Sequence, residues 1–206
     1  MDVEMEVTVT EAEFTLADVQ RVTGFDPEVI RAWRKRNHLP PAERYAKVKT
    51  REMASLMVRK LLIDHGFTPA GSWAIADHYA SSVLYFAILD TQACSVMGTK
   101  AAHAAFQAEF DNNDGFARRF AGVKGALNSL LVSSDGGALE PGELPEITDD
   151  SLTGYYINLC GLGRQLYPLA AKPLFNVHVA VQGDDQGAEI QRLYPRKIGH
   201  SGDRDD

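Results

Sequence analysis

The sequence predicts an α+β protein that is mainly α-helical, and two observations carry that prediction. In the first half of the chain, segments with helical periodicity begin at capping residues and end at glycine or proline. In the last third, apolar stretches typical of strands lie on both sides of a helix-like segment. This order predicts an N-terminal helical module, a helical middle and a small C-terminal sheet with a crossover helix.

Composition restricts the class of protein. The chain has 206 residues, of which 45% are hydrophobic and 24% charged, so it can bury a core in one large or two small domains. No apolar run approaches the ~18 residues that a membrane helix needs. The N-terminus is acidic and lacks the regions of a signal peptide. We therefore expect a cytoplasmic protein without a membrane segment.

The chemistry-bearing residue types form no catalytic pattern. Cys94 and Cys160 stand alone, without the spacing of a disulfide framework or a zinc site. The sequence contains no nucleophile elbow, no P-loop and no zinc-protease motif. His78, Cys94 and His103 are expected as packed or surface side chains rather than metal ligands. We therefore predict no enzymatic activity, no metal and no cofactor.

Charge is distributed unevenly along the chain. The net charge is −7, yet residues 20–65 hold eleven Lys or Arg against five Asp or Glu. Residues 1–19 hold six acids and no Lys or Arg. Binding to DNA depends on the local field at the contact surface, so a basic module within an acidic chain is a candidate for nucleic-acid binding.

The N-terminal elements follow from capping signals. Residues 1–13 are acidic and alternate weakly, which indicates an extended or disordered arm. Thr15 and Asp18 form a capping box that opens a short helix ending at Thr23-Gly24. Asp26 caps a second helix, which the Pro40-Pro41 pair ends. Two short helices joined by a glycine turn indicate a helix-turn-helix, whose second helix enters the DNA major groove.

The second helix is cationic. Val29, Ile30 and Trp33 share an apolar face, so we expect the intervening cations to face outward. The basic segment 42–49 predicts a small hairpin, or wing. Thr50 is expected to cap a helix that runs from residue 51 to 65 and ends at Gly66.

Residues 15–68 resemble the DNA-binding domain of the MerR family, a winged helix-turn-helix. The counterparts of the family pattern are Thr23-Gly24, Arg31-Ala32-Trp33, Leu39-Pro40-Pro41, the basic segment Arg44 to Lys49, and Gly66-Phe67-Thr68. Asn37 stands where the family usually has Gly, Arg34 stands where it often has Glu, and the wing lacks the usual Gly-Tyr-Arg-x-Tyr. The resemblance covers about a quarter of the chain and implies binding to double-stranded DNA.

The remaining segments are predicted by periodicity and turn residues. Residues 73–97 are apolar enough for one long helix, which in MerR-like proteins pairs two subunits; a core helix is the alternative. Further helices are expected at 100–110 and 116–123, a hairpin around Asp135-Gly136, strands at 155–160 and 175–181, and a helix at 161–172 despite Pro168. The predicted domains are an arm (1–13), a winged helix-turn-helix (14–70), a helical and α+β dimerisation or effector domain (71–182) and a polar tail (183–206).

The sequence thus predicts a sequence-specific DNA-binding transcriptional regulator that binds as a homodimer, with an unknown small-molecule effector. The predicted DNA-binding residues are Arg31, Arg34, Lys35, Arg36, Arg44, Lys47, Lys49 and Arg51. One alternative is a phage or mobile-element DNA-binding protein, excisionase-like or for packaging. Another is a ligand-binding or enzymatic C-terminal domain with an accessory DNA-binding module.

Overall fold

The structure, a computed structural model, describes residues 5–39, 47–89, 93–109, 113–133, 154–181 and 191–193. In these ranges the fold is α+β and mainly helical, which confirms the predicted class at that level. The helices are α1 (Leu16–Thr23), α2 (Pro27–Lys35), α3 (Thr50–Asp64), α4 (Gly71–Ile88), α5 (Lys100–Glu109), α6 (Asn113–Ala121) and α7 (Leu159–Ala170). The strands are β1 (Met5–Glu11), β2 (Glu13–Phe14), β3 (Val48–Lys49), β4 (Cys94–Gly98), β5 (Ser129–Ser133), β6 (Gly154–Asn158), β7 (Phe175–Val181) and β8 (Gln191–Leu193).

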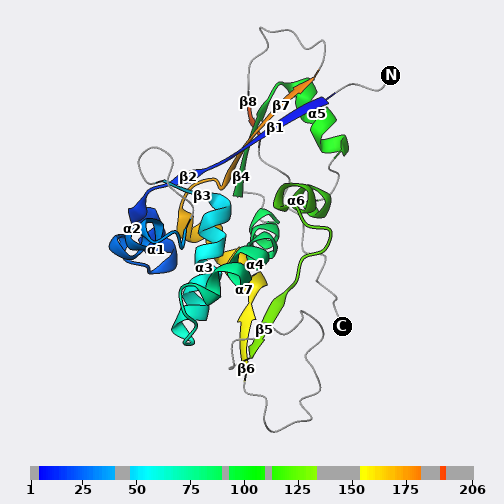
Figure 1. Ribbon diagram of the computed structural model, residues 1–206. Helices are drawn as coiled ribbons and strands as arrows, with labels where there is room; N and C mark the ends of the chain where they lie inside the picture. Colours follow the sequence, from blue (N-terminus) through cyan, green and yellow to red (C-terminus); the bar gives the residue numbers. More distant parts are fainter. Residues whose placement is uncertain are drawn as a thin grey trace, which may run out of the picture.

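The elements lie in three zones along the molecule. Figure 1 shows the sheet that contains β1, β4 and β7 at the top and the α3, α4 and α7 helices in the middle. The β5–β6 ribbon extends at the bottom, and α1 and α2 lie together on the left-hand side. The two-helix module is therefore at the periphery, where one of its faces can meet a partner.

The central sheet joins the two ends of the chain. Its strand order is β1-β7-β4-β8; β7 runs antiparallel to β1 and parallel to β4, and Val179 lies opposite Val7. The predicted arm is therefore a strand over residues 5–11, in which Met5, Val7 and Val9 pack toward the core while Glu6, Thr8 and Thr10 are exposed. Within the predicted tail, residues 191–193 form β8, and the rest of that tail lies outside the described residues.

Helix α4 is the central helix of the core. Val83, Leu84 and Ile88 are essentially buried, and the helix packs against α3, α6 and α7. The predicted helix 73–97 is wrong beyond Ile88, because residues 94–98 pair with β7 as strand β4. Since α3, α6 and α7 cover α4 within the chain, the structure favours the core-helix alternative.

The last third differs from the prediction in its pairing. Strand β5 pairs antiparallel with β6, whereas the sequence predicted a local hairpin around Asp135-Gly136, residues that lie outside the described ranges. Helix α7 is present and includes Pro168, as predicted. It connects β6 to β7, which belong to different sheets, so it is not a crossover within one small sheet.

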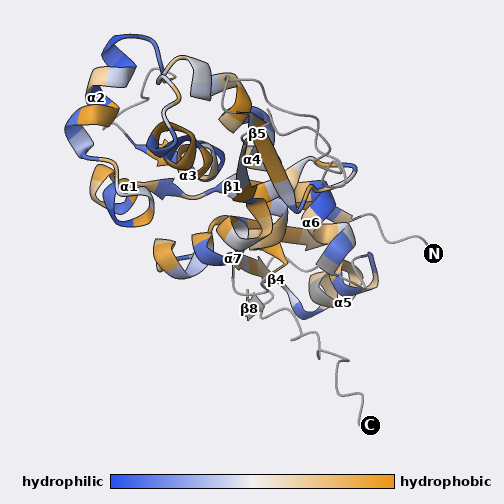
Figure 2. Ribbon diagram, turned by 90° about the horizontal axis from the view of Figure 1, so that it is seen from below, coloured by the Kyte–Doolittle hydropathy of each residue, from blue (hydrophilic) through white to orange (hydrophobic). Residues whose placement is uncertain are grey.

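The buried residues form one continuous cluster that extends from α1 and α2 to the central sheet. Figure 2 shows hydrophobic residues along α3 and α4, which pass through the middle of the molecule. The two-helix module thus shares its core with the rest of the chain. Among the described residues, no helix has both the length and the apolar character needed to cross a bilayer.

Candidate nucleic-acid interface

The α1–turn–α2 unit is defined by the caps that the sequence predicts. The Asp18 amide donates to Thr15 Oγ1 at 3.2 Å, and the Thr15 amide donates to Asp18 Oδ2 at 2.9 Å, which completes the capping box. Gly24 ends α1 with a φ of 76°, a left-handed conformation that suits glycine. The Glu28 amide donates to Asp26 Oδ1 at 2.7 Å, which caps α2.

The C-terminal end of α2 closes in a Schellman motif. The amide of His38 donates to the carbonyl of Trp33 at 2.8 Å, and that of Asn37 donates to Arg34 at 3.1 Å. Asn37 has a φ of 58°, in the left-handed region that Gly occupies readily and Asn tolerates. The residue that departs from the MerR-like pattern therefore lies where the backbone itself favours glycine.

One face of α2 holds the helix against the core. Ile30 and Trp33 are buried, and the rings of Phe25 and Trp33 meet edge-to-face at 4.9 Å between centroids. The guanidinium of Arg59 in α3 also contacts Trp33 and lies 4.2 Å from its ring centroid. These contacts fix which side of α2 is presented to solvent.

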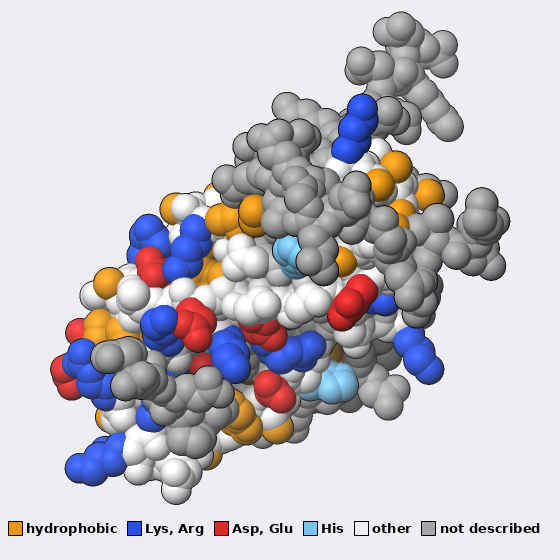
Figure 3. Space-filling view, turned by 90° about the horizontal axis from the view of Figure 1, so that it is seen from above, with side chains coloured by type: hydrophobic (Ala, Val, Ile, Leu, Met, Phe, Trp, Pro, Cys, Tyr) orange, Lys and Arg blue, Asp and Glu red, His pale blue; other side chains and the backbone are white. Residues whose placement is uncertain are grey.

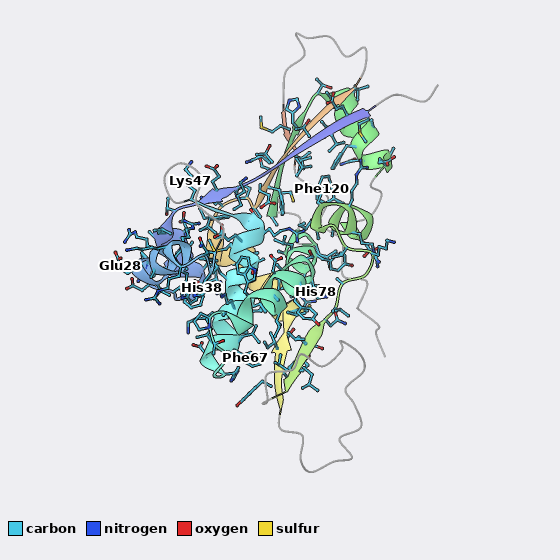
Figure 4. The ribbon with its side chains drawn as sticks, viewed as in Figure 1. Glu28, His38, Lys47, Phe67, His78 and Phe120 are labelled. Carbon is cyan, nitrogen blue, oxygen red and sulfur yellow. The ribbon has the colours of Figure 1, made fainter. Side chains whose placement is uncertain are left out.

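The opposite face of α2 is charged and exposed. Glu28, Arg31 and Lys35 are spaced by three and four positions, so they form one stripe along the helix, and Arg36 follows at its end. The Arg31 side chain is 55% exposed and forms an ion pair with Glu28. In Figure 4, Glu28 lies on the outer side of α2, away from α3.

Strand β3 and the residue before it supply two further exposed cations, Lys49 and Lys47. Lys49 lies opposite Glu13 and Val48 opposite Phe14, so β3 pairs with the strand that precedes α1. Lys47 forms an ion pair with Glu13, and this pairing lowers the pKa of the Glu13 carboxyl. The described residues do not show the hairpin, or wing, predicted for residues 42–49: residues 48–49 pair with β2, and Arg44 lies outside the described residues.

Two of the predicted DNA-binding arginines, Arg34 and Arg51, form hydrogen bonds within the protein. The Arg34 side chain is 9% exposed, and its Nη2 donates to the Lys47 carbonyl at 3.0 Å and to Glu52 Oε1 at 3.1 Å. Burial raises the pKa of Glu52, and the charge of Arg34 opposes that increase. The prediction that Arg34 faces outward is therefore wrong.

Arg51 forms contacts within the protein. Its Nη1 donates to Ser81 Oγ at 2.8 Å, and its Nη2 donates to the carbonyl of Ala121, at the end of α6, at 3.1 Å. The guanidinium therefore joins α3 to α4 and α6. These contacts hold Arg51 within the protein, so we leave it out of the proposed interface, and its predicted role of following the DNA backbone stays untested.

The structure also identifies two cations that sequence reasoning missed. Lys172 donates to the Glu13 carbonyl at 2.7 Å and lies 4.3 Å from the Phe14 ring centroid, so it supports β2. Arg59 is fully buried between α2 and α4. The sequence could have suggested this burial, because Arg59 lies within the helical segment from Met53 to Leu62, whose other residues are mostly apolar.

The charge around this interface is mixed. Figure 3 shows blue Lys and Arg side chains over the left-hand part of the molecule, where Asp and Glu lie among them. The exposed cations of α2 and β3 are Arg31, Lys35, Arg36, Lys47 and Lys49. Glu28 and Glu13 neutralise two of them, so an approaching phosphate has to compete with two ion pairs.

In the described ranges no group of three or more His, Cys, Asp or Glu is arranged to hold a metal ion. Burial raises the pKa of the Cys94 thiol to about 12, so it stays protonated at neutral pH and is a poor nucleophile. His78 is exposed on α4, and the side chain of His103 lies outside what the structure describes.

Comparison of the chain with protein-family models, with curated proteins and with solved structures found no match.

Proposed function

We propose that this protein is a sequence-specific regulator that binds double-stranded DNA through a MerR-like winged helix-turn-helix, with α2 in the major groove. The observation that carries the proposal is the exposed stripe of α2, which presents Arg31, Lys35 and Arg36 from a helix whose other face is fixed by Ile30 and Trp33. A rigid helix with cations on its free side fits the groove and meets phosphates on both edges.

The cations differ in what they contribute to binding. Arg31 lies in the middle of the stripe. A guanidinium at that place can donate two hydrogen bonds to guanine, one to O6 and one to N7. Lys35 and Arg36, at the end of α2, and Lys47 and Lys49, at the tip of β3, reach neighbouring phosphates. Phosphate contacts set affinity and its salt dependence, whereas the base contact sets sequence preference.

The first test selects bound duplexes from a pool with a randomised centre of about 20 base pairs, two helical turns. The selected duplex then serves for binding curves at several salt concentrations. Arg31→Ala should lower affinity for it by about 1–3 kcal/mol and reduce the preference over an unselected duplex. Lys35→Ala should weaken binding to both duplexes and reduce the slope of log K against log salt by about 0.9.

Arg119 provides a matched control for Arg31. Its side chain is 57% exposed and pairs with Glu109, yet it lies on α6, away from the proposed interface. Arg119→Ala should leave binding to the selected duplex unchanged. The proposed recognition by α2 is rejected if the selection enriches no sequence, or if Arg31→Ala and Arg119→Ala weaken binding equally.

Glu28 provides a test of the opposite sign. Because its carboxylate pairs with Arg31 and repels phosphate, Glu28→Gln should strengthen binding to an unselected duplex.

We also propose that binding occurs as a homodimer, as the family resemblance implies, with the subunits paired through a surface other than α4, which α3, α6 and α7 cover. Two-fold symmetry in the selected sequence, with half-sites about ten base pairs apart, would support it. A single asymmetric site, bound by one chain in sedimentation measurements, would contradict it.

A further inference from the structure

Arg59 is a buried cation that the stripe of α2 does not use. It belongs to α3, its exposed fraction is 0%, and no carboxylate in the described part of the chain forms an ion pair with it. Burial lowers the pKa of its guanidinium to about 10, so the side chain remains charged at neutral pH. A buried charge is costly unless polar groups compensate it.

The compensation comes from two separate parts of the chain. Nη1 donates to the carbonyl of His38, in the Schellman motif of α2, at 2.8 Å. On the other side, Nη2 donates to the carbonyl of Pro69, and Nε donates to Ser72 Oγ at 3.2 Å. Pro69 and Ser72 lie at the turn between α3 and α4 and at the start of α4.

The faces of the guanidinium meet two indole rings. Its central carbon lies 4.2 Å from the ring centroid of Trp33 in α2 and 5.2 Å from that of Trp73 in α4. Cation–π contacts are stronger for a desolvated arginine than for one exposed to water. The ring of Trp33 in turn meets Phe25, at the turn before α2. One side chain thus contacts the last turns of α2 and the first turn of α4.

We propose that Arg59 is a positioning residue that fixes the orientation of α2 relative to α4, and thereby the register in which the α2 stripe meets DNA. The planar guanidinium is suited to this role because it donates in three directions in one plane and stacks on aromatic faces. A lysine ammonium keeps the charge but is a compact donor that cannot bind all three acceptors from the same place. The inference rests on the proposed DNA-binding function.

The experiment compares Arg59→Lys with Arg51→Lys. Both arginines lie on α3 and donate to a serine hydroxyl and a backbone carbonyl, but only Arg59 contacts α2. Three measurements are made on the full chain: the stability to urea, amide hydrogen exchange along α2 and α6, and affinity for the selected duplex. Trp33 and Trp73 are the only tryptophans of the chain, so intrinsic fluorescence reports directly on the two indole rings that contact Arg59.

Arg59→Lys should change tryptophan emission, speed amide exchange at Arg36 to His38, and weaken DNA binding by roughly 2- to 30-fold, the range of a coupling of 0.5–2 kcal/mol. Arg51→Lys should speed exchange at the end of α6 and leave emission and DNA affinity unchanged. Ser72→Ala, which removes one acceptor of Arg59 without touching α2, should act as Arg59→Lys does but more weakly. It also serves as the test if Arg59→Lys does not fold.

Two results would overturn the inference. The first is a DNA affinity of Arg59→Lys equal to that of the wild type; if Arg59→Lys does not fold, the same result for Ser72→Ala counts. The second is an equal loss of DNA affinity in Arg59→Lys and Arg51→Lys, which would show an effect of stability alone. If the wild-type protein selects no duplex, the proposed function fails by itself. The emission and exchange data then still decide whether Arg59 fixes α2.

Discussion

The hydroxyl of Thr50 donates a hydrogen bond of 2.6 Å to the carbonyl of Leu174, although the two residues are 124 positions apart. The same carbonyl accepts the Ala12 amide at 2.8 Å, and the Leu174 amide donates to the Ala93 carbonyl at 2.7 Å. Leu174 therefore joins the start of α3, the β1–β2 corner and the start of β4. Thr50 was predicted to cap α3, but the cap position is Lys49, and the Thr50 hydroxyl serves this junction instead.

Thr50→Val should lower the free energy of unfolding by about 1 kcal/mol, because it keeps the shape of a fully buried side chain and removes one hydrogen bond. Thr50→Ser keeps the hydroxyl and separates this effect from packing. Urea unfolding of the three proteins measures the difference. A valine variant as stable as the wild type would show that the hydrogen bond makes no net contribution.

Arg34→Ala and Arg31→Ala should differ in stability, although both residues belong to the cationic helix. Loss of Arg34 leaves the largely buried carboxylate of Glu52, whose side chain is 17% exposed, without its ion pair and should cost about 1–3 kcal/mol at pH 7. Arg31→Ala should change stability by less than about 0.5 kcal/mol, because Arg31 is exposed. Equal stabilities would contradict the interior position of Arg34.

The Arg34→Ala effect should depend on pH. Burial raises the pKa of Glu52 above its usual 4.5, so its protonated form favours the native state, and this contribution is lost as pH rises through the native pKa. Removing Arg34 raises that pKa further. The stability difference between Arg34→Ala and wild type should therefore be largest near pH 7 and shrink as pH falls toward 4.5. Urea unfolding across this range is the measurement, and a difference that grows with acidity would contradict the assignment.

Asn37 and Ala171 are the non-glycine residues of positive φ in the described ranges, at 58° and 55°. Asn37→Ala should lower stability by about 1 kcal/mol, whereas Asn37→Gly should lower it little or not at all. Ala171→Gly, at the end of α7, should raise stability by up to about 1 kcal/mol. Thermal unfolding ranks the variants; a stabilising Asn37→Ala would show that the left-handed conformation is absent in solution.

Gly163 marks the closest approach of α7 to α4. A Cβ at this position would lie 2.5 Å from the Phe86 Cβ and 2.5 Å from the Val83 carbonyl oxygen. Gly163→Ala should therefore cost at least about 1–3 kcal/mol, since the helices have to separate. Gly125→Ala is the control, because no atom lies within 4 Å of its added Cβ, and it should change the melting temperature little. Similar melting temperatures for the two variants would contradict this packing.

The sequence predicted the elements that depend on neighbouring residues. The start of α1 at Thr15 and the start of α2 at Asp26 follow from local capping. The partners of strands were missed, because the register of β1 with β7 depends on residues roughly 170 positions away. The strand β4 was taken as helix because an apolar run does not by itself distinguish a buried strand from a helix.

The candidate site was also predicted only in part, because the exposure of a side chain depends on partners that are distant in the sequence. Arg31, Lys35, Arg36, Lys47 and Lys49 are exposed, as expected. Arg34 follows Ile30 by four positions, which places it only about 40° around the helix from the buried face. The helical spacing could thus have suggested that Arg34 is partly buried, but it could not have identified Glu52 as the partner of Arg34. Whether these residues bind DNA stays a prediction.

The pairing of β1 with β7 has a consequence for synthesis of the protein. Residues 5–11 leave the ribosome before residues 175–181 by roughly 170 positions, about 10–30 s at ordinary rates of translation. During that interval the nascent chain carries β1 without its partner strand, beside α1 and α2. The four-stranded sheet that holds β1 can close only after Val181 has emerged. A chain that stops before Phe175 would carry both helices without that support.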